Sequence, residues 1–454
     1  MEYYGVLQRT NLFDRARAVS YHRTMITETN GTAEFSLKTT LDGGMRVLTH
    51  HIPHARSVSV SIFAGVGSRY EPLELAGISH VVEHLLFKGT ERRPAPEQIS
   101  GAVEGVGGYM NAGTEQELTV YWCKVAQQYM TEVLDLLFDM VRNSLVDPKE
   151  VEREKLVVVE ELNMINDFPN QKVEAIIDEM LWPDHPLGRD IGGTRDSVMA
   201  MTRETVVGHV EQYYSPANMV VSVAGNVEHD EVVKQVAAMC EGWAPVDIPS
   251  WTHFIDEQDS PQFGMETRKT EQSHLAIALP GVSSTHPDRY ALDLLSVVLG
   301  EGMSSRLFVE VREKRGLAYD IHSSAGHFLD CGVLSIGAGV DPKRVHEAVE
   351  TILAEIAQLR EGVPDEELEK AKRLSTGTML LRMEDTRSVS SWMGGQELLL
   401  GHVLGVDEVV ESIEAVTTDD LKRVAEELLV TEKLNMAVVG PSRGAARFQR
   451  LLKL

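Results

Sequence analysis

The stretch Met201-Thr202-Arg203-Glu204 starts a helical pattern, which leads into a strand-like run, Met219-Val220-Val221-Ser222-Val223, and ends at Gly225. The same succession of helix, strand and glycine starts again at Thr417 and ends at Gly440. In both copies the glycine follows the threonine by 23 positions, and the offset between the copies is 215 residues. Equal patterns at a fixed offset indicate that one unit of this length occurs twice in the chain.

A second pair of helix starts supports the duplication. Asp147-Pro148-Lys149-Glu150, the cap and first turn of a helix, matches Val363-Pro364-Asp365-Glu366 at an offset of 216 residues. Strand signals alternate with long helices in each half, and the runs 118–126 and 219–224 suggest antiparallel pairing. We therefore predict an α+β fold of two homologous halves, each an antiparallel sheet covered by helices on one face, joined by a linker and closing like a clamshell.

Proline, tryptophan and acidic residues interrupt the pattern between the two copies. Glu241-Gly242-Trp243-Ala244-Pro245 and Ile248-Pro249-Ser250-Trp251 precede the acidic stretch Asp256-Glu257-Gln258-Asp259, a composition typical of a linker. We therefore expect four segments: an N-terminal extension of unknown role (1–35), a first half (36–240), a linker (241–268) and a second homologous half (269–454).

Composition limits the classes of function. The formal net charge of −26 would repel nucleic acid, and no apolar run reaches the roughly 18 residues that a membrane span needs. The charge favours basic ligands if it concentrates in a cavity, although acidity that only maintains solubility explains it equally well. Nucleic-acid binding and a membrane span are therefore not expected.

The cysteines and the first residues bear on the compartment. Cys123, Cys240 and Cys331 are far apart and odd in number, which indicates a reducing environment. The N-terminus has no apolar signal core, and Glu2 and Asp14 interrupt an arginine-containing stretch that would otherwise suggest a transit peptide. A cytoplasmic location of bacterial type is expected, and the mitochondrial matrix is the weaker alternative.

His80-Val81-Val82-Glu83-His84 has the spacing H-x-x-E-H. On a helix, His80 and His84 lie on one face, from which two imidazoles can bind the same Zn²⁺ ion. Glu83 lies beside them, where its carboxylate can reach a water at the metal without being a ligand itself. The competing interpretation is a polar helix face on which the histidines are incidental.

A catalytic zinc site usually has three protein ligands. The helix that starts at Asp147-Pro148 contains Glu154 and Glu161, seven residues apart, which places them two turns apart on one face. One can bind the metal while the other orients a ligand, although an acidic, solvated helix face is the alternative. The second half has Leu295-Ser296-Val297-Val298-Leu299 at the position that corresponds to H-x-x-E-H, so the metal site is expected in the first half only.

Taken together, several motifs resemble the pitrilysin family of inverzincin zinc metallopeptidases, in particular the mitochondrial processing peptidase β-subunit and its bacterial processing-protease relatives. These motifs are H-x-x-E-H, Phe87-Lys88-Gly89-Thr90, Asn111-Ala112-Gly113-Thr114, and Glu152-Arg153-Glu154 leading to Glu160-Glu161. The resemblance covers about residues 38 to 445 and includes the arrangement in two halves.

The resemblance implies roles for individual residues. A distal glutamate completes the zinc site of the family, and counting from different motifs gives Glu161 or Glu160. We expect Glu161, because Glu154 then matches the second, supporting glutamate of the family. Asn111, Ala112, Gly113 and Thr114 would form the sheet edge where an extended substrate adds as a further strand, although Gly113 stands where an aromatic residue is more usual.

The resemblance also draws attention to the segment from Ser304 to Tyr319, which is expected to close over the active site. Within it, Arg312 and Tyr319 match an arginine and a tyrosine of the family that contact the substrate backbone or stabilise the tetrahedral intermediate. The alternative is a surface arginine and a packed strand tyrosine.

We therefore expect a zinc-dependent endopeptidase with one Zn²⁺ per chain, bound by His80, His84 and Glu161, and with Glu83 as the general base. Mn²⁺ and Co²⁺ are alternatives to zinc, and unfolded or extended basic peptides are the expected substrates. Two rival hypotheses are a non-catalytic or partner-dependent subunit of a processing-peptidase-like complex, and a zinc-dependent peptide-binding protein that does not cut. The complete set of motifs favours a self-sufficient enzyme, expected as a homodimer, with a heterodimer containing a paralogue as the alternative.

Overall fold

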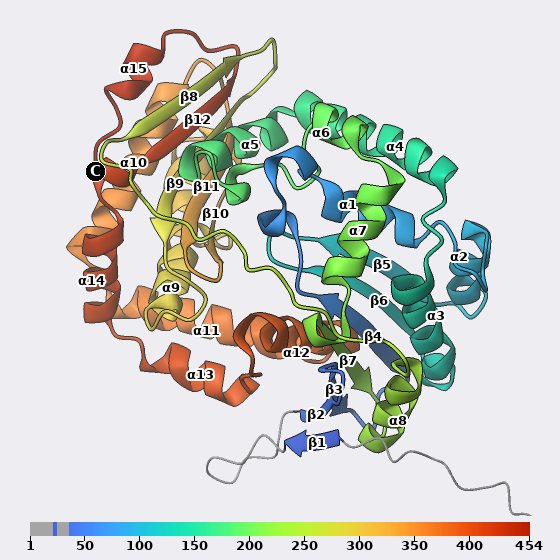
Figure 1. Ribbon diagram of the computed structural model, residues 1–454. Coiled ribbons are helices and arrows are strands. Elements are labelled where there is room, and N and C mark those ends of the chain that lie inside the picture. Colours follow the sequence, from blue (N-terminus) through green and yellow to red (C-terminus); the bar gives the residue numbers. More distant parts are fainter. Residues whose placement is uncertain (1–20, 25–35) are drawn as a thin grey trace, which may run out of the picture.

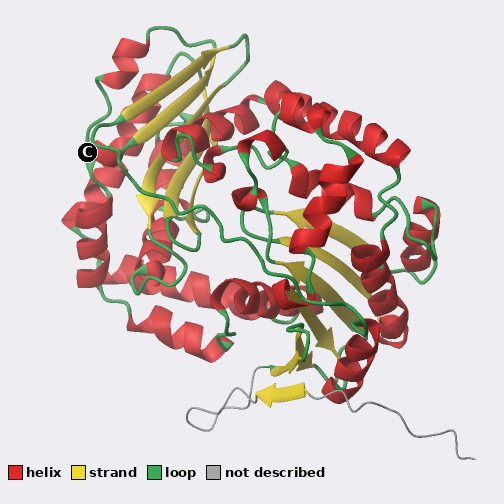
Figure 2. Cartoon of the chain, viewed as in Figure 1, coloured by secondary structure: helices red, strands yellow, loops and turns green. Residues whose placement is uncertain are grey.

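The computed structural model describes residues 21–24 and 36–454. The strands form two separate β-sheets, and helices surround each sheet (Figure 1 and Figure 2). Among the described residues, no helix combines the length and the apolar character that a bilayer crossing requires.

The first half contains the sheet that lies next to the metal-binding motif. Its strands are β1 (Tyr21–Thr24), β2 (Leu37–Leu41), β3 (Arg46–His51), β4 (Ser57–Ala64), β5 (Tyr109–Thr114), β6 (Thr119–Ala126) and β7 (Met219–Gly225). Its helices are α1 (Ile78–Leu86), α2 (Pro96–Glu104), α3 (Met130–Asn143), α4 (Pro148–Asp167), α5 (Pro169–Leu181), α6 (Arg195–Ala200), α7 (Arg203–Tyr213) and α8 (His229–Met239).

The second half contains a smaller sheet and a larger share of long helices. Its strands are β8 (Gln262–Thr267), β9 (Ser273–Gly281), β10 (Ala318–His327), β11 (Gly332–Val340) and β12 (Asn435–Gly440). Its helices are α9 (Arg289–Gly300), the π-helical segment η6 (Phe308–Lys314), α10 (Val345–Glu361), α11 (Asp365–Arg382), α12 (Thr386–Leu400), α13 (Val406–Ala415), α14 (Thr418–Leu428) and α15 (Ala445–Gln449).

The two repeated segments form the same local structure. Thr202 and Thr417 precede α7 and α14, and both residues have φ −109° and ψ 164°. Each threonine hydroxyl accepts a hydrogen bond from the backbone N–H three residues later, at 3.3 Å from Thr205 and 3.2 Å from Asp420. These bonds satisfy N–H groups that the first turn of a helix leaves free.

The two sheets also share their topology. The strand order is β1-β2-β3-β7-β4-β6-β5 in the first sheet and β10-β11-β9-β12-β8 in the second. Read from its other end, the second sheet repeats the part of the first that runs from β3 to β5, so that β10 corresponds to β5. The predicted α+β fold with two homologous halves is therefore confirmed.

Each sheet contains one parallel pair, where only antiparallel pairs were expected. β7 is antiparallel to β4 and parallel to β3, and β12 is antiparallel to β9 and parallel to β8. β3 and β4 follow each other through a short turn and run in opposite directions. A strand that inserts between two such neighbours must be parallel to one of them.

Helices cover both faces of each sheet, not one face as predicted, because each half places one helix on the sheet of the other half. α12 of the second half packs on β4 and β7, where Val389 and Met393 share a core with Phe63. α5 of the first half packs on β9 and β12, and its Val173 and Ile177 belong to the core on that face. This second cover explains why every residue of β7 and β12 is buried.

Regular structure of the second half begins earlier than predicted. β8 begins at Gln262, so regular structure of the second half starts inside the range 241–268 that was expected to be a linker. The short alternating run of β8 follows the proline-rich and acidic break directly, so the sequence pattern does not separate it from the linker.

Of the predicted extension, residues 1–20 and 25–35 lie outside the described residues, while Tyr21–Thr24 pairs with β2 as β1. The other segment boundaries stay predictions.

The halves and the linker meet at one fully buried guanidinium, that of Arg69 (0% exposed). Its Nη1 lies 2.6 Å from Oε1 of Glu117 in the first half, and its Nη2 lies 2.5 Å from Oδ1 of Asp330 in the second. Nε and Nη2 both donate to the carbonyl oxygen of Thr252 in the linker, and the Trp251 ring lies 4.1 Å from the guanidinium. We call this group of five residues the Arg69 junction.

Replacing Arg69 by methionine should lower the free energy of unfolding by about 3–5 kcal/mol, because it leaves the buried carboxylate of Glu117 and the partly buried one of Asp330 without their cation. The matched control is Arg153→Met, since Arg153 is 68% exposed and pairs with Glu150 on its own helix. The control should cost less than about 1 kcal/mol. Urea unfolding followed by circular dichroism measures both, and equal losses would show that the Arg69 junction contributes no special stability.

Candidate metal centre

The helix α1 exposes the H-x-x-E-H face because its other face is apolar. Ile78, Val81, Val82, Leu85 and Leu86 are buried in the main core of the first half. His80, Glu83 and His84 are partly exposed and lie together at spacings of three and four residues.

The N-terminus of α1 is fixed by a buried carboxylate. Glu71 accepts hydrogen bonds from the backbone N–H groups of Gly77 at 2.7 Å and Ser79 at 2.8 Å. A negative charge at this position satisfies free N–H groups and interacts favourably with the helix dipole. Gly77 has φ +92°, and a Cβ there would lie 2.3 Å from the carbonyl oxygen of Gly192. The first turn of α1 therefore has little freedom to move.

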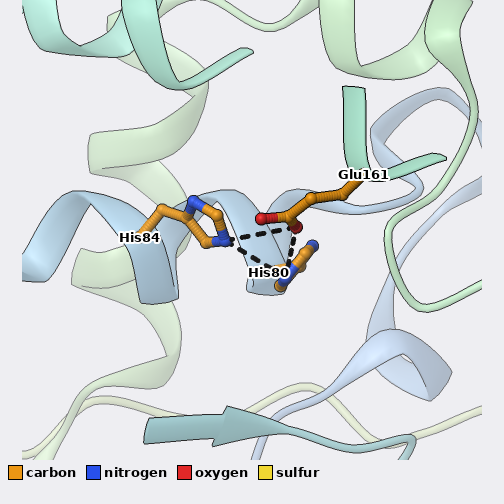
Figure 3. A group of neighbouring side chains, drawn as sticks. All are labelled: His80, His84 and Glu161. Carbon is orange, nitrogen blue, oxygen red and sulfur yellow. Dashed lines mark hydrogen bonds and ion pairs between the residues drawn. The ribbon is translucent and has the colours of Figure 1, made fainter. Parts of the chain in front are cut away.

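Three possible ligand atoms converge between α1 and α4 (Figure 3). The Nε2 atoms of His80 and His84 are 3.3 Å apart, and Oε2 of Glu161 lies 3.6 Å from each. Ligand atoms at about 2.0–2.1 Å from a tetrahedral zinc ion are separated by about 3.3 Å, so the triangle fits zinc. Glu160 is exposed and is not part of this group, the only such group found among the described residues.

The second glutamate of α4 orients one of the histidines. Glu154, which is 2% exposed, lies with Oε2 at 3.1 Å from Nδ1 of His84 and with Oε1 at 2.9 Å from Nζ of Lys88. This contact leaves Nε2 of His84 directed toward the possible metal position. Nδ1 of His80 is buried and has no hydrogen-bond partner among the described residues, so only one of the two histidines has such support.

The charge states of these groups suit a cation. Burial lowers the pKa of His80 to about 4, with a further contribution from His84, so the ring is neutral near pH 7. Burial also acts to lower the pKa of His84, but Glu154 and Glu161 outweigh it and raise the value. Burial would raise the pKa of Glu154, yet the hydrogen bonds from His84 and Lys88 lower it. The site therefore collects carboxylates around two imidazoles, which a divalent cation would neutralise.

Glu83 faces the edge of the first sheet. Its Oε2 accepts a hydrogen bond of 2.6 Å from the hydroxyl of Thr114, at the end of β5. Among the described strands, β5 pairs only with β6, so its other edge has no strand neighbour. Asn111, Ala112 and Gly113 precede Thr114 in this edge strand, and a Cβ on Gly113 would meet nothing within 4 Å.

The structure brings Arg312 and Tyr319 together, but not to the metal centre. Nη1 of Arg312 donates to the carbonyl oxygen of Tyr319 at 2.7 Å, and the guanidinium lies 4.8 Å from the tyrosine ring. The Tyr319 side chain is 76% exposed. Among the described residues, their hydrogen bonds and ring contacts stay within the second half, and none reaches His80, His84 or Glu161.

Two supporting features had no signal in the sequence patterns. Glu71 precedes α1 by several residues in a stretch without periodicity, so its role as a cap depends on the path of the chain. Gly193 packs against the start of α1, and a Cβ there would lie 2.0 Å from the carbonyl oxygen of Ala76. A glycine pair shortly after α5 is the only trace that such a close backbone approach leaves in a sequence.

Family models match both halves of the chain. The model described as insulinase, peptidase family M16, matches residues 46–195, and the model described as the peptidase M16 inactive domain matches residues 200–375. An uncharacterized zinc protease of Streptomyces coelicolor is 37% identical over 94% of this chain and 94% of its own length. An uncharacterized zinc protease of Bacillus subtilis is 35% identical over 89% of this chain and 98% of its own length.

Solved structures share the fold. A protease from Helicobacter pylori superposes with a TM-score of 0.85 at 24% identity, covering 89% of this chain and 99% of that chain. A structure described as the peptidase M16 inactive domain from Pseudomonas fluorescens gives a TM-score of 0.84 at 18% identity, over 90% and 99% of the two chains. The names of the relatives support zinc binding and a peptidase-like function, and the predicted resemblance to the pitrilysin family is confirmed. The chain belongs to peptidase family M16.

Proposed function

We propose that this protein is a zinc-dependent endopeptidase that cleaves unfolded or extended peptides, preferably basic ones, in a space that closes between its two halves. The observation that carries the proposal is the convergence of His80, His84 and Glu161 next to Glu83, which itself contacts the edge strand β5. A binding protein would need the three ligands but would have no use for a carboxylate beside them.

In the proposed mechanism, His80, His84 and Glu161 hold one Zn²⁺ per chain. The ion, when bound, lowers the pKa of water and polarises a carbonyl group. Glu83 accepts the proton of the attacking water and later donates it to the leaving amine. Glu154 keeps the His84 ring oriented through its Nδ1 atom.

The substrate would bind along β5 as an additional strand, with Asn111, Ala112, Gly113 and Thr114 as its neighbours. The open space beside Gly113 leaves room for a substrate side chain. Because Thr114 contacts Glu83 at 2.6 Å, a peptide paired with this strand would pass close to the general base. A folded protein cannot offer the extended segment that such pairing requires.

Arg312 and Tyr319 would stabilise the oxyanion only after they approach the metal centre. Their separation from it in the structure supports two alternatives, a movement of the second half or a partner chain that supplies this function. We propose a homodimer, with a heterodimer containing a paralogue, and hence a partner-dependent subunit, as the second candidate. The match of the second half to a domain described as inactive gives this candidate specific support.

Glu83→Gln should reduce peptide cleavage by about 10²–10⁴-fold without releasing zinc, because it removes the general base and no ligand. Cleavage of an unfolded peptide mixture is followed by mass spectrometry, and zinc content by atomic absorption. The matched control is Glu160→Gln, since Glu160 is exposed and outside the ligand group. Full activity of Glu83→Gln would contradict the mechanism, and an inactive wild-type protein with bound zinc would favour the partner-dependent subunit.

Glu154→Gln should weaken zinc affinity by about 10–100-fold, because His84 loses the carboxylate that orients it. Competition with a chromophoric chelator measures the affinity. Glu152→Gln is the control, since Glu152 lies on the same helix and pairs with Lys155 away from the histidines. If both variants bind zinc as the wild-type protein does, Glu154 has no role at the metal.

Basic peptides should be cleaved at least about tenfold faster than acidic peptides of equal length at low ionic strength, because the net charge of −26 attracts cations. The difference should decrease as salt is added. Equal cleavage rates at low salt would exclude the preference for basic substrates while leaving the peptidase mechanism intact.

A further inference from the structure

A cavity lies in the second half, on the side of η6 that faces α10 and α11. It has a volume of about 690 Å³ and is bounded by residues of α9, η6, α10 and α11. Val298, Val309 and Leu374 form apolar parts of its wall. Its lining contains none of the possible metal ligands of the first half. A cavity of this size is sufficient for a small organic molecule.

One carboxylate in this cavity has no partner. Glu355 of α10 is 7% exposed, yet it has no hydrogen bond or ion pair with any residue that the structure describes. A carboxylate on a side chain that is largely buried is normally paired with a donor. Burial raises the pKa of Glu355, and the nearby Glu310 adds to this effect.

The other acidic residues of the cavity are paired or, in the case of Glu361, exposed to solvent, which distinguishes Glu355 from them. Glu367 pairs with Nε of Arg306 at 2.8 Å, and Glu310 pairs with Lys314. Glu301 accepts a hydrogen bond of 2.9 Å from the hydroxyl of Ser296. Glu355 is therefore the largely buried carboxylate of the cavity wall that is free to accept a hydrogen bond from a ligand.

The surroundings limit the chemistry of that donor. A metal ion would need several ligand atoms close together, and no group of this kind occurs at Glu355 within the described part of the chain. An anion is disfavoured, because five glutamates outnumber the three basic residues of the lining, Arg306, Arg315 and Lys370. An aliphatic chain that ends in a cationic donor satisfies both the carboxylate and the apolar wall.

We propose that this cavity binds a small organic cation, an aliphatic ammonium or guanidinium compound, whose charged group pairs with Glu355 and whose carbon chain lies against Val298, Val309 and Leu374. The site is independent of the proposed peptidase activity. It adjoins the segment that carries Arg312, because Val309 belongs to both η6 and the cavity wall.

Calorimetric titration of the full-length protein with n-butylamine and, separately, with n-butylguanidine tests the proposal and distinguishes an ammonium from a guanidinium ligand. 1-Butanol, which keeps the carbon chain without the charge, is the comparison compound. The variant Glu355→Gln removes the charge, and Glu350→Gln is its control, because Glu350 is exposed on the same helix. Leu374→Trp narrows the cavity at a side chain that is 41% exposed and leaves every charge in place.

The expected result is saturable binding of one amine per chain that weakens about tenfold or more in Glu355→Gln and in Leu374→Trp but not in Glu350→Gln. Equal binding by all variants would show diffuse attraction to an acidic protein and would overturn the proposal. The absence of binding by either amine at millimolar concentrations would also overturn it. Zinc content and peptide cleavage are read separately, so a failure here leaves the proposed function untouched.

Discussion

The Arg69 guanidinium imposes the constraint on which the arrangement of the two halves depends. A fully buried cation is tolerated only when all of its partners are in place, and here the partners come from the first half, the linker and the second half. Glu117 lies in the turn between β5 and β6, and Asp330 lies in the turn between β10 and β11. Because β5 and β10 are equivalent edge strands, the Arg69 junction joins corresponding hairpins of the two repeats and fixes their relative position.

The segment from Arg69 to Glu71 also positions the candidate metal centre. Two residues after Arg69, Glu71 binds the first backbone N–H groups of α1, and α1 carries both histidines and Glu83. Thr114 donates a hydrogen bond to Glu83 and ends the edge strand β5, which leads to Glu117. The helix α1 is therefore also linked to the Arg69 junction through this strand. The interface between the halves, the helix α1 and the sheet edge are thus connected through buried and partly buried polar contacts.

The two repeats have kept one topology and diverged in chemistry. The first half has a helix with two histidines, and the corresponding sequence of the second half lies in α9. From Leu292 onward, the only polar residues of α9 are Asp293 and Ser296. The second half instead has η6, a π-helical segment of a kind often found at functional sites, with Arg312 on it and a cavity behind it. The exchange of α5 and α12 binds these specialised halves together through their sheets.

The sequence by itself determined the duplication, the α+β class and the helix with its two histidines, because capping residues and periods of 3.6 and 2 are local properties. Spacing alone left Glu160 and Glu161 open, since both lie on one helix and only its rotation against α1 brings Glu161 to the histidines. The parallel strand pairs, the exchanged helices and the Arg69 junction were decided by tertiary structure alone. Arg69 and Asp330 are 261 residues apart, and a contact over such a separation leaves no periodic pattern, because its geometry exists only after both halves have packed.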